Sequence, residues 1–284
     1  MSLNRPIFKL LDWINKEYII NCTSLSRNPN AIDLLEDNPD KIDWFYLSGN
    51  PNAIHLLEKN IDNIYWNIIS SNPNAFNLLK TNRNKINWAG LAFNYNIDCF
   101  KLYLENPDKI NWYIISQNPN AVELYENNNH MKDLNYWKYL SKNTNPEAIN
   151  ILRDNPENIY WEYLSNNHSL EAIKLLEQNY NKIDWKFLSA NPNAIHLLEK
   201  NQDKIDWFNL SGNPNAIKLL EKNIDEIYLN EFAKNPSIFE LDYNKMKIIN
   251  QDMYEELIKE VMKPLRIFKY MTEKYDYLEE LFGD

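Results

Sequence analysis

The chain has 284 residues, of which 44% are hydrophobic and 13% aromatic, and its formal net charge is −10 at pH 7. The hydrophobic content argues against a disordered chain, and the negative charge argues against binding to nucleic acid or to anionic membranes. Only 4 glycines are present, which disfavours a β-protein with many tight turns. The composition therefore favours a folded, helical protein.

The first twenty residues carry charges throughout and contain neither the apolar core nor the cleavage site of a secretory signal peptide. No stretch of the chain approaches the ~18 apolar residues of a membrane-spanning helix. We therefore expect an intracellular protein that is neither secreted nor bound to a membrane. Leu10, Leu11, Trp13 and Ile14 are spaced as on one face of a helix, which predicts an N-terminal cap helix over residues 1–19.

From residue 20 to residue 244 a motif recurs every 22 to 25 residues. Its clearest marker is a tryptophan, found at Trp44, Trp66, Trp88, Trp112, Trp137, Trp161, Trp185 and Trp207. The same register places Cys22 one step before this series and Leu229 one step after it, as expected for divergent end units. Periods of this length are typical of solenoids and propellers, and about ten units are present.

Each unit begins with a motif such as Asn-Pro-Asn-Ala-Ile at 50–54, followed by two leucines. Asn is favoured just before a helix and Pro at its first position, so this half predicts a short helix with one apolar face. A closing asparagine such as Asn60 is expected to end the helix in a left-handed conformation. The second half, Ile-Asp-Trp-x-x-Leu-Ser at 42–48, predicts another short helix that opens after the Asp, Asn or Tyr before each Trp.

These patterns predict an all-α solenoid of about ten 22–25-residue two-helix repeats over residues 20–244, with helical end caps. The Ala-Ile-Leu-Leu face is expected to pack on Ile, Trp and Leu, and one helix of each pair is expected to be 3₁₀ in part. At ~8 to 10 Å per stacked unit, the array would be a rod or arc on the order of 80 to 100 Å long. Asparagines at the turns can bond backbone groups in their own turn and in the next, so ladders of asparagine side chains are expected.

The middle units are two or three residues longer, with insertions at 94–98, 127–130, 143–145 and 166–169 that predict longer turns. Residues 251–284 contain no asparagine, and the stretches 254–262 and 264–268 are typical of two helices with a proline at their junction. Residues 245–284 therefore predict a separate C-terminal module, which is either a cap on the last repeat or a docking element for a partner.

The repeat Asn-Pro-Asn-Ala-Ile-x-Leu-Leu-Glu-x-Asn-x-Asp-Lys-Ile-Asp-Trp-x-x-Leu-Ser resembles the tandem repeat proteins of giant DNA viruses of amoebae, the mimivirus-like and marseillevirus-like groups. The segments at 9–14 and 262–267 also resemble the ends of proteins in that family, although Lys263 stands where the resemblance leads us to expect a histidine before Pro264. The repeat is more distantly similar to leucine-rich-variant repeats, which alternate α- and 3₁₀-helices. The resemblance implies a viral repeat protein located in the host cytoplasm or in the virus particle, and it brings no catalytic residues.

No constellation of residues in the sequence is typical of an enzyme or of a cofactor site. His55 and His196 occupy one slot of the repeat in which other units carry Asp, Asn, Lys or Glu, which indicates a solvated position. His130 and His168 have no Cys or His at metal-ligand spacing. Cys22 and Cys99 replace Trp or Ala of other repeats and are expected to be small buried hydrophobic residues without a disulfide. We expect no catalysis, no cofactor and no metal.

One slot varies freely, directly after each tryptophan. We call these residues the post-Trp residues; they are Phe45, Asn67, Ala89, Tyr113, Lys138, Glu162, Lys186 and Phe208. Their neighbours are fixed by packing, so this slot predicts either a solvent-facing ridge that binds a partner or side chains that lie flat against the next repeat.

The leading hypothesis for function is a protein-binding scaffold that engages a host or viral protein through this variable face. One alternative is a structural or packing component of the virus particle that associates with itself through its Asn-rich edges. A second alternative is single-stranded nucleic-acid binding by stacked aromatics, which the net charge of −10 disfavours.

Overall fold

The computed structural model describes residues 6–121, 134–249 and 251. The chain divides into two compact units, residues 10–239 and the combination of residues 1–9 with 240–284. The described part is largely helical, as predicted, apart from one two-stranded sheet of β1 (Phe8–Leu10) and β2 (Phe239–Leu241). Among the described residues no helix is long and apolar enough to span a bilayer.

The N-terminal cap helix predicted over residues 1–19 is wrong for residues 6–15, and only residues 16–19 of that range are helical. Phe8–Leu10 is extended, because this segment pairs with β2 and Lys9 Nζ lies 2.9 Å from Glu240 Oε1. Helix α1 begins only at Lys16 and ends at Ile20, with the side chain of Asn15 accepting a bond from the Glu17 N–H. The helical spacing at 10–14 was misleading because strand pairing depends on residues more than 220 positions away. Most of the predicted module at 245–284 lies outside the described residues. Residues 243–249, which include the start of this module, are helical.

Within residues 10–239 most repeat units contain three short elements. The first is an α-helix at the Ala-Ile-x-Leu-Leu motif: α2 (Ile32–Glu36), α4 (Ile54–Lys59), α6 (Phe76–Thr81), α8 (Ile97–Leu104), α12 (Pro146–Arg153), α14 (Leu170–Gln178), α16 (Ile195–Glu199) and α18 (Ile217–Glu221). The second is a 3₁₀ turn: η2 (Pro39–Lys41), η3 (Ile61–Asn63), η4 (Arg83–Lys85), η5 (Pro107–Lys109), η7 (Pro156–Asn158), η8 (Tyr180–Lys182), η10 (Gln202–Lys204) and η11 (Ile224–Glu226).

The third element is the second helix of the unit. These elements are η1 (Thr23–Arg27), α3 (Trp44–Ser48), α5 (Trp66–Ile69), α7 (Trp88–Leu91), α9 (Trp112–Ile115), α11 (Leu134–Leu140), α13 (Trp161–Ser165), α15 (Trp185–Ser189), α17 (Trp207–Ser211) and α19 (Leu229–Lys234). Most of them begin at the tryptophan, as predicted, and the side chain before it often caps the helix, as Asp43 does by accepting from the Tyr46 N–H at 3.1 Å. Helix α11 is the exception, because it starts three residues before Trp137.

The first helix begins later than predicted. In the unit at 50–54, the residue before the helix is Ala53, and Asn50-Pro51-Asn52 forms a turn in which Asn50 Oδ1 accepts from the Asn52 N–H at 3.0 Å. Asn followed by Pro at the first positions of a helix occurs at α12 and at the short 3₁₀ segments η9 (Pro192–Ala194) and η12 (Pro236–Ile238), and η6 (Pro119–Ala121) also begins at a proline. The asparagine is held in the turn because its amide group bonds the preceding unit.

Two further local predictions are wrong. Asn60 closes α4 with φ −132° and ψ 51°, which is not left-handed, and its Nδ2 donates to the Leu56 carbonyl at 2.8 Å. The side-chain amide thus satisfies the carbonyl that a left-handed cap would serve. The extra residues of the middle units lengthen α8, α12 and α14 to 8, 8 and 9 residues and do not form longer turns. The insertion predicted at 127–130 lies outside the described residues.

The core consists of the alanines and leucines of both helices, such as Ala53, Leu57 and Leu47, which have no exposed surface. The tryptophans, predicted to belong to this core, are mostly half-buried, and Trp137 alone is buried among those whose side chains the structure describes. Lysine side chains from the following unit lie over two of these rings, with Lys85 Nζ 4.7 Å from the Trp66 centroid and Lys204 Nζ 4.5 Å from the Trp185 centroid. These two tryptophans therefore pack between units with one part of the ring open to a charged side chain.

Asparagine side chains form the predicted ladder. Asn50, for example, is fully buried, and its Nδ2 donates to the carbonyls of Ser26 at 3.0 Å and Asn28 at 2.8 Å in the preceding unit. The same pair of hydrogen bonds from Nδ2 to two backbone carbonyls of the neighbouring unit is made by Asn28, Asn72, Asn94, Asn118, Asn143, Asn167, Asn191, Asn213 and Asn235. The prediction of asparagine ladders is confirmed for these residues.

A second ladder of buried serines was not predicted. Ser48 Oγ donates to the Trp44 carbonyl at 2.7 Å and accepts from the Tyr65 N–H of the next unit at 3.0 Å. Ser70, Ser141, Ser165, Ser189 and Ser211 make the same two bonds. The signal was present in the sequence, because a serine follows most tryptophans at the fourth position.

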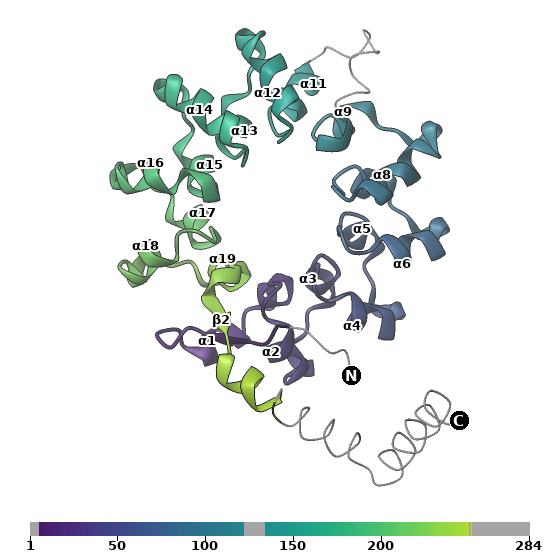
Figure 1. Cartoon of the computed structure of the whole chain (residues 1–284), viewed down its shortest axis with the longest axis vertical. Coiled ribbons are helices and arrows are strands. Elements are labelled where there is room, and N and C mark those ends of the chain that lie inside the picture. Colours follow the sequence, from purple (N-terminus) through teal and green to yellow (C-terminus); the bar gives the residue numbers. More distant parts are fainter. Residues whose placement is uncertain (1–5, 122–133, 250, 252–284) are drawn as a thin grey trace, which may run out of the picture. The chain divides into compact units, whose positions relative to one another are not determined.

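The two ends of the array are joined, which differs from the rod or arc with separate ends that the repeats predicted. Asn28 Nδ2 donates to the carbonyls of Ala233 at 2.9 Å and Asn235 at 2.8 Å, so the first unit bonds the last one as every other unit bonds its predecessor. Ser24 Oγ donates to the Asn230 carbonyl at 2.6 Å. In Figure 1, α1 accordingly lies beside α19, both within residues 10–239.

Candidate interaction surface

The post-Trp residues lie on the second helices. In Figure 1 the second helices of residues 10–239, such as α3, α5, α15 and α17, lie on the inner side of the array, and first helices such as α4, α6, α16 and α18 lie on its outer side. Seven of the post-Trp residues are exposed, namely Phe45, Asn67, Ala89, Tyr113, Glu162, Lys186 and Phe208. Lys138 is half-buried. The exposure is what a ridge requires, and partner binding by these residues stays a prediction.

Two of these exposed side chains belong to aromatic pairs that bridge neighbouring units. Phe45 on α3 lies 5.4 Å from Tyr65, which precedes α5, and their rings are nearly perpendicular at 82°. Phe208 on α17 lies 5.5 Å from Tyr228, which precedes α19, at 74°. The four side chains are 41% to 52% exposed. Each Phe therefore packs edge to face on the next unit and still presents apolar surface to solvent.

A different cluster surrounds Tyr163 on α13. Lys138 Nζ and Lys142 Nζ lie 5.3 and 4.3 Å from the centroid of the Tyr163 ring, and Phe187 packs on the same ring at 6.2 Å. Burial and the positive charge of Lys138 lower the pKa of Lys142. Because both ammonium groups cover an aromatic ring, this cluster is a contact between the unit of α11 and the unit of α13.

The histidines of the repeated slot also link units. His55 Nε2 lies 2.9 Å from Glu36 Oε1, and His196 Nε2 lies 2.9 Å from Glu177 Oε1, so each histidine meets a glutamate of the preceding unit. All four side chains are partly exposed, as the variation of this slot among units predicted. His168 contributes its backbone carbonyl to the side chain of Asn193, and His130 lies outside the described residues.

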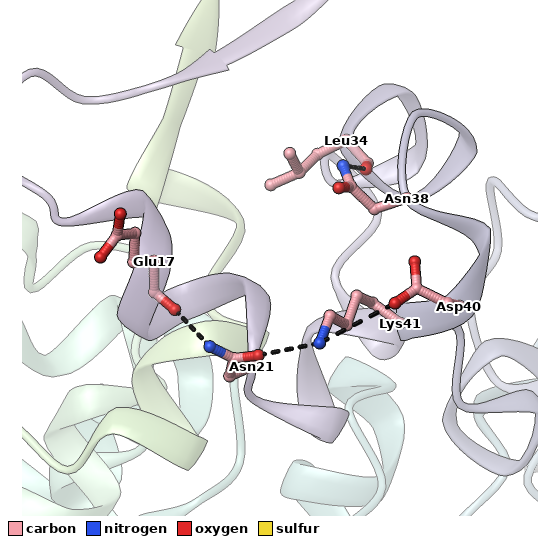
Figure 2. A network of polar contacts seen from close by, with 6 residues as sticks. All are labelled: Glu17, Asn21, Leu34, Asn38, Asp40 and Lys41. Carbon is pink, nitrogen blue, oxygen red and sulfur yellow. Dashed lines mark hydrogen bonds and ion pairs between the residues drawn. The ribbon is translucent and has the colours of Figure 1, made fainter.

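The polar groups around the first unit are matched in the same way (Figure 2). Lys41 Nζ donates to Asn21 Oδ1 at 3.1 Å, and Asn21 Nδ2 donates to the Glu17 carbonyl at 2.8 Å. Asn38 Nδ2 donates to the Leu34 carbonyl at 2.8 Å. In the described part of the chain every buried side-chain nitrogen or oxygen atom has a hydrogen-bond partner. Of the bonds in Figure 2, Lys41 to Asn21 joins two units, and the two bonds donated by asparagine Nδ2 close helix ends within a unit.

The cysteines differ in burial. Cys99 has no exposed surface, and burial, with a smaller contribution from Asp98, raises the pKa of its thiol to about 11. Cys22 is half-buried, and partial burial raises the pKa of its thiol. Neither thiol is activated towards nucleophilic chemistry, because a reactive cysteine needs a lowered pKa. No group of three or more His, Cys, Asp or Glu side chains among the described residues is placed to hold a metal ion.

Comparison of the chain with protein-family models, with curated proteins and with solved structures gave no match. The distinctive feature of the described surface is the pair of exposed Phe–Tyr contacts, Phe45 with Tyr65 and Phe208 with Tyr228.

Proposed function

We propose that this chain is a non-catalytic, protein-binding scaffold, built as a solenoid of helical repeats, that holds a partner protein along its post-Trp residues. One observation carries the proposal: Phe45, Tyr113 and Phe208 are 41% to 47% exposed at a repeat position whose residue varies from unit to unit. Exposed aromatic side chains are typical anchors of protein interfaces, because they bury a large area at a low cost in conformational entropy.

The recurring residues support this division of roles. Buried asparagines and serines hold successive units together, and they leave the variable slot free to change without loss of the fold. Repeat proteins commonly place binding residues on a continuous face in this way. We further propose that the chain belongs with the repeat proteins of amoebal giant viruses and acts inside the infected cell, on the strength of the Asn-Pro-Asn-Ala-Ile and Ile-Asp-Trp motifs alone.

The test is a comparison of partners captured by two variants of the chain. The double variant Phe45→Ala and Phe208→Ala removes the two exposed Phe side chains of the post-Trp slot. Leu170→Ala serves as the control, because Leu170 is 61% exposed on the outer helix α14. The wild type and the two variants would each be used as bait in lysate of infected amoebae, with bound proteins measured by quantitative mass spectrometry. We expect at least one protein to be bound by the wild type and the control and to be depleted about tenfold or more with the double variant. Equal recovery by all three baits would contradict the proposal.

The alternative of a packing component of the virus particle is less well supported. It proposes self-association through Asn-rich edges, whereas buried asparagines such as Asn50 already use their amide groups to bond the neighbouring unit. Asn28 and Ser24 likewise bond residues 230–235 of the same chain. Single-stranded nucleic-acid binding remains disfavoured by the net charge of −10.

A further inference from the structure

The two exposed aromatic pairs come from two nearly identical stretches of sequence. Residues 42–65 and 205–228 differ at only three positions, Tyr46 against Asn209, His55 against Lys218 and Asn63 against Glu226. Both stretches contain Asp-Trp-Phe and end in Ile-Tyr, and both give a Phe–Tyr pair with ring centroids 5.4 or 5.5 Å apart. The other described units carry different residues at the post-Trp slot, so the surface has two copies of one local site.

Closure of the array brings the two copies near each other. Phe208 lies on α17 and Phe45 lies on α3. Two second helices stand between them around the closed array, because α17 contacts α19, α19 contacts η1, and η1 contacts α3. Three steps at ~8 to 10 Å each separate the two sites by about 24 to 30 Å. An extended peptide advances ~3.3 to 3.6 Å per residue, so about eight residues span this distance.

The surroundings of both sites are acidic. Each Phe stands two positions after the Asp that caps its helix, which is Asp43 for Phe45 and Asp206 for Phe208. The stretch 42–65 holds three acidic residues against one basic, and the stretch 205–228 holds four against two, so each has a net charge of −2 with His neutral. The elements between the two sites, α19 and η1, carry two basic side chains: Lys234, which is paired with Glu231 at 2.6 Å, and the exposed Arg27. An aromatic surface within negative charge favours a cation as its ligand.

The array itself shows that its aromatic rings accept cations. Lys85 lies over Trp66, Lys204 over Trp185, and Lys142 over Tyr163, with Nζ 4.3 to 4.7 Å from the ring centroids. Within the described residues none of the lysine–ring contacts involves Phe45, Tyr65, Phe208 or Tyr228. The two pairs are thus ring surfaces of the same kind that no lysine in the described part of the chain covers.

We infer that the two Phe–Tyr pairs are a bivalent site for an extended basic segment of the partner protein, which places one arginine or lysine on each pair with about eight residues between them. This inference rests on the proposed function, since it specifies the chemistry of the partner. Two weak cation–π contacts on one peptide strengthen each other, because the first contact raises the local concentration of the second cation.

The experiment measures binding of dye-labelled peptides to the full chain by fluorescence anisotropy at low salt. The probe is a Gly-Ser peptide with two arginines eight residues apart, and the comparison peptides carry two leucines, two glutamates, or two arginines only three residues apart. We expect the first probe to bind at least about tenfold more tightly than the others. Equal binding of the leucine peptide would indicate a purely apolar site, and stronger binding of the glutamate peptide would indicate an anion site; both results would overturn the inference.

Variants assign the binding to these rings. Phe45→Leu with Phe208→Leu keeps apolar side chains and the net charge but removes two aromatic faces, and we expect about tenfold weaker binding of the arginine probe. Phe93→Leu is the matched control, because Phe93 is 42% exposed outside the post-Trp slot, and this variant should bind the arginine probe as the wild type does. An unchanged affinity in the double variant would overturn the inference. If the arginine probe fails while capture of the partner still depends on Phe45 and Phe208, the inference is lost and the proposed function stands.

Discussion

At the scale of single residues, the asparagine that opens each repeat has a role that its place in the motif does not reveal. The side chain of Asn72 makes three hydrogen bonds: Nδ2 donates to the carbonyls of Ser48 and Asn50, and Oδ1 accepts from the Asn74 N–H. One amide therefore shapes its own turn and fixes the distance to the unit before it. Asp could not replace it, because a carboxylate cannot donate to the two carbonyls.

The substitution Asn72→Ala leaves the carbonyls of Ser48 and Asn50 without their donor in a buried site, so we expect the free energy of unfolding to fall by about 2–4 kcal/mol. Asn74→Ala is the control: Asn74 Nδ2 also donates to the preceding unit, at the Pro51 carbonyl, but this residue is exposed and water can replace the bond. Its loss should be under about 1 kcal/mol. Urea titrations of both variants measure the difference in the free energy of unfolding. Equal losses would mean that the buried asparagine bonds stabilise the fold no more than the exposed ones.

At the scale of elements, neighbouring second helices approach each other closely enough that one position requires glycine. A Cβ atom on Gly90 of α7 would lie 2.8 Å from the Asn67 carbonyl oxygen of α5 and 3.2 Å from Ser70 Cβ. The contact is with backbone, which cannot rotate away as a flexible side chain can. Gly212, between α17 and α19, has its nearest such neighbour, the Glu231 carbonyl oxygen, at 3.6 Å.

Gly90→Ala and Gly212→Ala should therefore change the free energy of unfolding by amounts that differ in sign or size. Helix propensity alone would make alanine at position 90 more stable than glycine by ~1 kcal/mol. We expect the clash to outweigh this, with a net loss of about 1–3 kcal/mol in the free energy of unfolding. Gly212→Ala should change it by less than about 0.5 kcal/mol. Thermal unfolding followed by circular dichroism suffices, and a stabilised Gly90→Ala variant would show that α5 and α7 lie further apart than described.

At the scale of the whole array, joined ends remove the two interfaces that an open solenoid must protect with capping units. The end units predicted as caps are instead ordinary members of the series: η1 contacts both α3 and α19, and Asn28 bonds residues more than 200 positions away. The Trp13 and Phe232 rings also lie 5.7 Å apart across this junction.

Asn28→Ala tests the junction directly. In a closed array it removes the same two buried bonds as Asn72→Ala, so the two variants should lose a similar free energy of unfolding, about 2–4 kcal/mol. In an open array Asn28 would face solvent, and its substitution would cost less than about 0.5 kcal/mol. The comparison of the two variants in one urea series decides between these outcomes, with Asn72→Ala as the internal reference.

The sequence by itself determined what depends on a unit and its nearest neighbour. The Trp register located the second helices, the Ala and Leu positions located the core, and the recurring asparagines predicted the ladder, because each of these features is repeated in every copy. The variability of the post-Trp slot left open whether its side chains face solvent or lie against the next repeat, and the structure shows both features at Phe45 and Phe208. Where local rules failed, as at Asn60, a side chain had taken the role that the rule gives to the backbone.

Only the tertiary structure decided that residues 24–30 meet residues 230–236, that Phe8–Leu10 is a strand, and that the Phe45 and Phe208 sites are three units apart and not seven. Closure depends on the sum of small rotations between successive units. No single repeat displays that sum, because a slightly different rotation would give an open array from nearly the same motif.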